Sequence, residues 1–215
     1  MSSRSLDELA VQFRDDLNKL FSDCFGESPF EIELSATNTG RVTISTSRNA
    51  DKLFVISSSR KILASFLFGL ELDRENKYLS VAKSEFHVFF GAAKRTEPIF
   101  RYEYVKAMHT AKVPNSHLHI HAQRGEFTHA QQNWDLFKDS LVPMSAAHFP
   151  VGGGFMRPSL EEVLLFCDRE FHLDFSKSTV KKLIDSMESY RETQALAIAR
   201  EYRSVLEAHG WSKSD

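Results

Sequence analysis

The chain has 215 residues, of which 42% are hydrophobic and 26% are charged, and this balance fits one globular domain or one domain with a helical appendage. The net charge of −2 excludes a strong basic field, so any binding of nucleic acid would depend on a local positive patch. The two cysteines, Cys24 and Cys167, form no C-x-x-C pair, which argues against a thiolate zinc site. The polar N-terminus does not resemble a signal peptide and the apolar stretches are too interrupted to cross a bilayer, so we expect a cytoplasmic protein.

The chain begins with a predicted amphipathic helix over residues 5–25. Ser5 and Glu8 have the spacing of a capping box, and apolar residues recur every three or four positions after them. Gly26 follows as a helix stop.

Seven segments after this helix have the alternation or composition of strands. They cover residues 30–34, 41–47, 52–57, 62–72, 78–90, 99–105 and 117–123. The short polar connection over residues 73–76 predicts an antiparallel hairpin, and no crossover helix separates the segments. We therefore expect an antiparallel sheet of about six or seven strands.

The rest of the chain is predicted to be a long irregular segment followed by helices. Residues 124–158 are punctuated by glycine and proline, with a short helix expected near residues 131–139. Ser159 and Glu162 form a second capping box, and a strongly helical stretch over residues 178–209, as one helix or two, ends at Gly210.

These elements predict an α+β fold, in which one helix precedes the antiparallel sheet and two or three C-terminal helices follow it. We expect an α+β domain over residues 1–175 that carries a histidine-bearing strand. A helical extension over residues 176–215 would pack on that domain.

The most informative motif is the pentad His117-Leu118-His119-Ile120-His121. On a strand, its three imidazoles project from one face while Leu118 and Ile120 face the core. Each imidazole needs polar partners, so we expect the histidine face to line a cleft. The structural alternative is a polar strand face that is covered by residues 124–158.

Metal binding is the first chemical interpretation of the pentad. Two histidines at alternate positions can share one zinc ion with a third ligand. His117 and His121 lie about 13 Å apart on an extended strand, so all three histidines do not suit one ion. The third ligand would come from one of three residues elsewhere in the chain, His129, His148 or Glu126.

The second interpretation is nucleotidyl transfer, because a neutral imidazole can attack phosphorus. The run from His117 to Gln123 resembles the signature of the histidine triad nucleotide hydrolases and transferases. That resemblance implies that the middle histidine, His119, is the nucleophile.

The third interpretation is general acid–base cleavage of RNA, because imidazole titrates near neutral pH. An arginine would hold the phosphate, and the candidates are Arg101, Arg124 and Arg157. Arg101 shares its strand face with Glu103, so that strand can present charge to the histidines. His87, set between phenylalanines and a valine, is predicted to be a hydrogen-bonded core or edge histidine.

Three segments in sequence order resemble the closing half of TumE-type toxins of bacterial toxin–antitoxin systems. They are the arginine–tyrosine run 100–104, the histidine strand 116–121 and the helix start 158–164. The resemblance implies a growth-inhibiting toxin that cleaves RNA, of bacterial or phage origin, with an antitoxin as a protein partner.

We therefore predict a toxin-like enzyme that acts on RNA or nucleotide phosphodiester bonds. Its site would hold His117, His119 and His121 as catalytic residues and Arg101, Arg124 and Arg157 as phosphate-binding residues. No cofactor is expected in this mechanism, although the histidines would also suit zinc. A binding module for a protein partner, a histidine triad-like hydrolase and a metal-dependent hydrolase are the alternatives, and none of them requires a membrane.

Overall fold

A computed structural model of the chain describes residues 4–33, 40–46, 53–91, 97–106, 113–122, 149–151 and 157–211. Its first elements are helix α1 (Leu6–Phe25) and strands β1 (Phe30–Glu33), β2 (Val42–Thr46), β3 (Phe54–Ser57), β4 (Ile62–Leu72) and β5 (Leu79–Phe90). They are followed by β6 (Phe100–Val105), β7 (Ser116–Ile120), β8 (Phe149–Pro150), α3 (Leu160–Phe171), α4 (Lys177–Glu201) and α5 (Arg203–Ala208).

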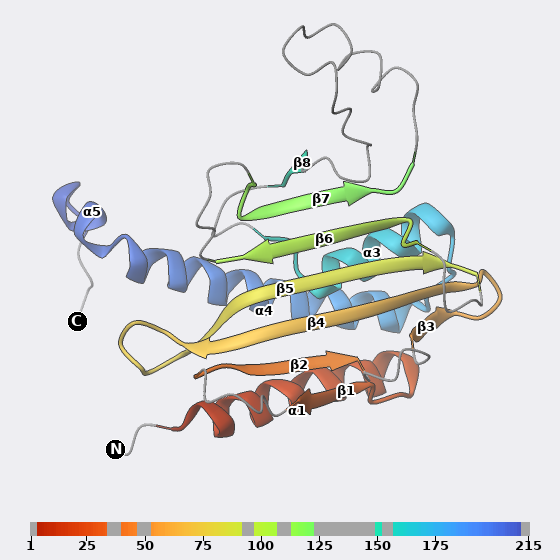
Figure 1. Cartoon of the computed structure of the whole chain (residues 1–215), viewed down its shortest axis with the longest axis horizontal. Coiled ribbons are helices and arrows are strands. Elements are labelled where there is room, and N and C mark those ends of the chain that lie inside the picture. The colour runs from red at the N-terminus through yellow and green to blue at the C-terminus, as the bar shows by residue number, and fades with distance from the viewer. Residues whose placement is uncertain are drawn as a thin grey trace, which may run out of the picture.

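The predicted α+β fold is confirmed. Within the described ranges the sheet has eight strands in the order β1-β2-β4-β5-β6-β7-β8, with β3 paired to β4, and every pairing is antiparallel. Figure 1 shows the long β4–β5 hairpin at the middle of this sheet. The additional strand is β8, which is only two residues long and lies in the segment that was expected to be irregular. The helix expected near residues 131–139 lies outside the described residues.

Both predicted capping boxes are present. The Ser5 N–H donates to Glu8 at 2.8 Å and the Glu8 N–H donates to Ser5 Oγ at 3.2 Å, and Ser159 and Glu162 repeat the arrangement at 2.8 and 3.1 Å. These reciprocal bonds satisfy backbone donors that a helix start leaves open. Gly26 then ends α1 with a φ of 74°, which glycine adopts without steric cost.

The hydrophobic core lies between one face of the sheet and helices α1, α3 and α4 (Figure 1). Phe21 of α1 is fully buried, and its ring meets those of Phe30, Phe54 and Phe66 with centroids 4.9 to 5.9 Å apart. On β6, Phe100 and Tyr102 join the same core, and the Phe100 ring packs on Phe166 of α3. The high phenylalanine content therefore fills one layer between sheet and helices.

Helix α4 joins this core through its first half. Leu183 is fully buried, the Thr179 hydroxyl donates to the Cys24 carbonyl at 3.4 Å, and Lys182 Nζ donates to the Asp23 carbonyl at 2.7 Å. Further along the helix no described residue is fully buried, and the break between α4 and α5 falls at Tyr202. None of the described helices is long and apolar enough to cross a membrane.

Replacing Phe21 by alanine should lower the free energy of unfolding by about 3–5 kcal/mol, because the change removes a large ring from a core that cannot collapse fully into the space. Urea unfolding followed by circular dichroism measures this loss. Phe90→Ala is the matched control, because the Phe90 side chain is 60% exposed and should cost little. Equal losses in the two variants would contradict the described core.

Candidate functional site

Strands β6 and β7 bring a carboxylate and two histidines together on the sheet face that points away from the helices. Their antiparallel register places Glu103 opposite His117 and Arg101 opposite His119. Leu118, between the histidines, packs against the core on the other face. The alternation predicted for the pentad is therefore what directs both imidazoles to one side.

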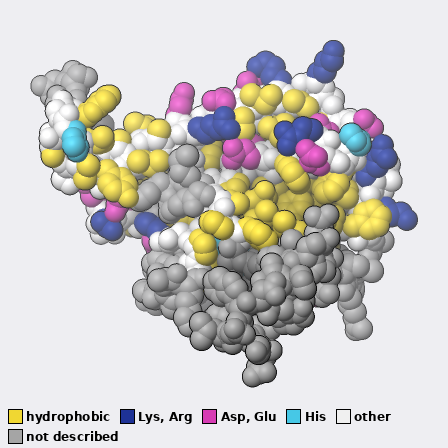
Figure 2. Space-filling view, turned by 90° about the horizontal axis from the view of Figure 1, so that it is seen from above, with side chains coloured by type: hydrophobic (Ala, Val, Ile, Leu, Met, Phe, Trp, Pro, Cys, Tyr) yellow, Lys and Arg dark blue, Asp and Glu magenta, His cyan; other side chains and the backbone are white. Residues whose placement is uncertain are grey.

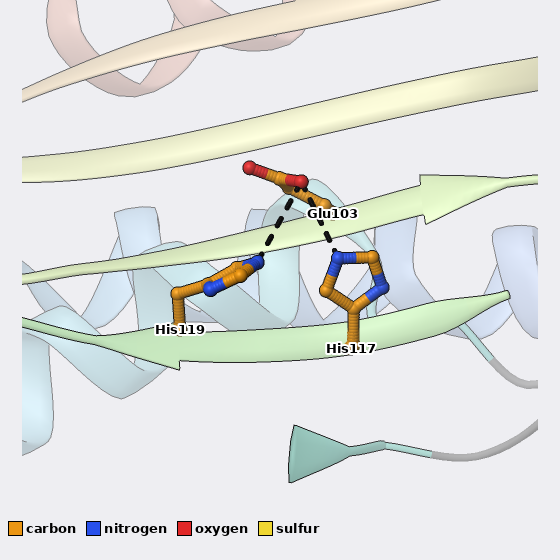
Figure 3. A group of neighbouring side chains, drawn as sticks. All are labelled: Glu103, His117 and His119. Carbon is orange, nitrogen blue, oxygen red and sulfur yellow. Dashed lines mark ion pairs between the residues drawn. The ribbon is translucent and has the colours of Figure 1, made fainter. Parts of the chain in front are cut away.

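Glu103 lies between the two imidazoles (Figure 3). Its Oε2 is 3.3 Å from His117 Nε2 and 3.8 Å from His119 Nε2. The two imidazole rings meet edge to face, with centroids 5.0 Å apart. These three side chains form the candidate site, which we call the Glu–His–His cluster.

Two further groups orient the cluster. The Pro114 carbonyl lies 2.9 Å from His117 Nδ1, and a carbonyl oxygen can only accept, so Nδ1 carries a proton. The other carboxylate oxygen of Glu103, Oε1, is 2.8 Å from Arg101 Nε. This contact is an ion pair rather than an aligned hydrogen bond, since Arg101 Nε has no hydrogen-bond partner in the described part of the chain.

The histidine face does not line an open cleft, and that expectation is wrong. His117 and His119 are each only 2% exposed. The side chains of Arg101 and Glu103 are 30% and 23% exposed, so solvent reaches the cluster from the β6 side. Much of segment 124–158, which was the predicted cover in the structural alternative, lies outside the described residues.

His121 does not join the cluster. Its Nδ1 lies 3.5 Å from Glu97, whose side chain is 83% exposed, and its backbone N–H donates to the Ile99 carbonyl just beyond the end of β7. The separation expected along an extended strand explains why His117 and His119 share Glu103 while His121 has a different partner.

Of the two predicted phosphate-binding arginines that lie within the described residues, the structure brings Arg101 to the cluster and not Arg157. Arg157 lies on the opposite side of the sheet, where its guanidinium stacks between the rings of Tyr104 and Tyr190, 5.3 and 5.2 Å from their centroids. Burial raises the pKa of Tyr190 to about 12, so this ring stays neutral beside the cation. Arg124 lies outside the described residues, as do the three residues proposed as a third metal ligand, Glu126, His129 and His148.

Glu103 is the site residue that the sequence-based assignment of catalytic residues left out. The sequence contained a signal for Glu103, because Glu103 and Arg101 lie on the same face of a predicted strand near the pentad. Only the β6–β7 register shows that this carboxylate, rather than a distant one, meets the histidines.

His87 of β5 extends the same polar face, where it stands opposite Arg101. The prediction of a hydrogen-bonded histidine is wrong for one of its nitrogens, because Nε2 is buried and makes no hydrogen bond in the described part of the chain. Burial lowers the pKa of His87, against the opposing effect of the nearby Glu85 and Glu103 charges. A buried polar atom without a hydrogen bond lowers the stability of the fold. His87 on this face of the sheet is therefore not explained by stability alone.

The Glu–His–His cluster offers two kinds of chemistry. One ligand atom from each side chain lies within 4.8 Å of the others, so the three can surround a single metal ion. Alternatively, the imidazoles can exchange protons with a substrate while Glu103 balances the charge. Arg101 adds a fixed positive charge that suits a phosphate.

Comparison with protein-family models, curated proteins and solved structures finds no match to this chain. The resemblances to TumE-type toxins and to the histidine triad signature therefore stay predictions, and the function must be argued from the geometry of the cluster.

Replacing His87 by glutamine should make the stability of the protein less sensitive to acid. Because burial lowers the pKa of His87, the unfolded chain, with a histidine pKa of about 6.5, takes up a proton that the folded state resists. The stability from His87 is therefore full above about pH 6.5 and is lost as the pH falls below it, at no more than about 1.4 kcal/mol per pH unit.

Urea unfolding at several pH values below and above this point measures the effect. The stability of His87→Gln should fall less steeply with acid than that of the wild type, whereas His209→Gln, at an exposed position, should follow the wild type. Parallel curves for wild type and His87→Gln would show that His87 does not resist protonation in the folded state.

Proposed function

We propose that this protein cleaves phosphodiester bonds in RNA or nucleotides, with Glu103, His117 and His119 as the reaction centre and Arg101 as the phosphate-binding residue. The observation that supports this proposal is the convergence of two imidazole Nε2 atoms on one carboxylate, beside an arginine. An arginine suits the phosphate, and imidazoles suit proton transfer near neutral pH.

Cleavage of RNA at such a centre needs one base and one acid. The 2′-hydroxyl gives its proton to a base, its oxygen bonds to phosphorus, and the bond between phosphorus and the 5′-oxygen breaks as that oxygen takes up a proton from an acid. His119 stands directly opposite Arg101 and is the central residue in this scheme, with His117 as its assistant. Arg101 would stabilise the negative charge that develops on the phosphate oxygens.

The exposure of the four side chains favours one direction of approach for a phosphate. Arg101 and Glu103 are partly exposed and the imidazoles are buried, so an incoming phosphate meets the guanidinium before it meets a histidine. Exclusion of water around the imidazoles strengthens their electrostatic effect on a bound phosphate.

The toxin-like role is the finer part of the proposal. It is supported by the resemblance of the β6, β7 and α3 segments to TumE-type toxins, in the same order along the chain. A bacterial or phage protein of this kind would inhibit growth until an antitoxin partner binds it, and it would act in the cytoplasm.

Inducible expression in a bacterial host tests the proposal. The wild type should arrest growth, and the purified protein should cleave RNA. His119→Ala should abolish the arrest and lower the cleavage rate by about 100- to 10,000-fold, the usual contribution of a general acid or base. His119→Gln is a second variant that also lacks the imidazole but fills more of the buried space than alanine does.

The control for this experiment is His209→Ala, a histidine at the exposed end of α5, which should behave as the wild type. Circular dichroism and a thermal melt establish that each variant is folded. A folded wild type that neither slows growth nor cleaves RNA would refute the proposal.

A binding module is the second candidate function, and the α4–α5 arm favours it. Four apolar side chains there are 44 to 71% exposed, namely Leu196, Tyr202, Val205 and Trp211. Figure 2 shows the arm at the left with hydrophobic side chains at its surface. If His117, His119 and His121 can be changed together to glutamine without loss of a growth phenotype, the arm rather than the cluster carries the function.

A further inference from the structure

We infer that Glu103, His117 and His119 bind one divalent transition-metal ion, with zinc as the expected ion, through Glu103 Oε2 and the Nε2 atom of each histidine. The geometry of the cluster alone supports the binding of the ion. Only the use of the ion in catalysis rests on the proposed function.

The tautomer of His117 is the first argument. Its Nδ1 donates to the Pro114 carbonyl, so in the neutral ring Nε2 carries a lone pair. This nitrogen lies 3.3 Å from Oε2 of Glu103. A neutral imidazole nitrogen and a carboxylate oxygen at this distance are suited to bind one cation together.

The distances favour the metal ion over the proton. A charge-assisted hydrogen bond between imidazolium and carboxylate is normally about 2.7–2.9 Å long. The contacts of Glu103 Oε2 with His117 and His119 are 3.3 and 3.8 Å. Two ligands of one tetrahedral zinc ion, each about 2.0–2.2 Å from it, are about 3.3–3.6 Å apart. The first contact has this spacing, and the second, at 3.8 Å, is close to it.

Burial is consistent with ligation by the two imidazoles. Both rings are only 2% exposed, and a bound metal ion would be held there by coordination to the two Nε2 atoms as well as by the negative charge of Glu103.

The second shell is that of a metal site. Ligating histidines usually give their other N–H to a carbonyl or carboxylate, as His117 does to Pro114, and ligating carboxylates are themselves held. Arg101 holds Oε1 of Glu103, which leaves Oε2 directed to the histidines. The carboxylate is therefore set to bind through one oxygen.

The ligand set identifies the class of ion. Two imidazoles and one carboxylate with further positions open suit catalytic zinc, and the same set can hold iron(II). In the proposed cleavage the bound ion would supply the base, a water molecule with a lowered pKa that takes up the proton of the 2′-hydroxyl in place of an imidazole that binds the ion. Zinc is favoured because this chemistry needs no redox change.

The test uses full-length protein purified without a histidine tag and stripped with a chelator. Isothermal titration with zinc should show one equivalent bound, and zinc should raise the melting temperature. Changes to residues that only support metal ligands weaken metal binding by up to about 100-fold. Loss of a ligand in His117→Gln or His119→Gln should therefore weaken zinc binding by at least about 100-fold. X-ray absorption of the zinc form should show nitrogen and oxygen ligands without sulfur.

The chain offers a matched control in Glu97 and His121, which also pair a carboxylate with a histidine but lie outside the cluster, with the Glu97 side chain 83% exposed. Glu97→Gln and His121→Gln should bind zinc as the wild type does. Folded protein that binds no stoichiometric zinc, or binding that survives in a His117→Gln, His119→Gln double variant, would overturn the inference. One equivalent of iron rather than zinc in protein analysed as purified would support the site and overturn the choice of ion.

The two proposals fail in different ways. Phosphodiester cleavage by the metal-free protein would overturn the use of the ion in catalysis while the proposed function stands. Zinc bound on these three residues without any cleavage of RNA or nucleotides would support the site and refute the proposed function.

Discussion

The register between β6 and β7 is the constraint on which the rest of this structure depends. Phe100 and Leu118 must face the helices, because that face supplies the apolar surface of the core. With the pleat fixed in this way, Glu103 and His117 can only point to the opposite face, where they meet. A slip of one residue would exchange the two faces of the strand, so the burial of the phenylalanines also holds the cluster together.

The polar face of β5, β6 and β7 departs from the rule that buried polar atoms are hydrogen-bonded. His87 Nε2 has no hydrogen bond within the described ranges, and the contact of Arg101 with Glu103 is not an aligned one. Such departures are expensive, and folds keep them mainly where a site needs them. The other face of the sheet carries the packed core, and there the buried Ser116 Oγ also makes no hydrogen bond in the described part of the chain.

The choice between proton transfer and metal binding depends on the Pro114 carbonyl. By fixing the proton of His117 on Nδ1, this backbone oxygen determines what Nε2 offers to Glu103. The same three side chains could serve either chemistry in another setting. Here the tautomer, the long contacts and the burial of both rings favour an ion at the centre of the cluster.

The sequence by itself determined the described helices and the strands before β8, because capping boxes, strand alternation and helical periodicity are local signals. It also placed His117 and His119 on one face, which follows from strand geometry alone. Only the tertiary structure decided that Glu103 completes the cluster, that Arg157 stacks on the opposite face and that the histidines are buried. Those outcomes depend on strand register and on which segments pack together, and contacts between residues far apart in the chain leave no periodic trace in the sequence.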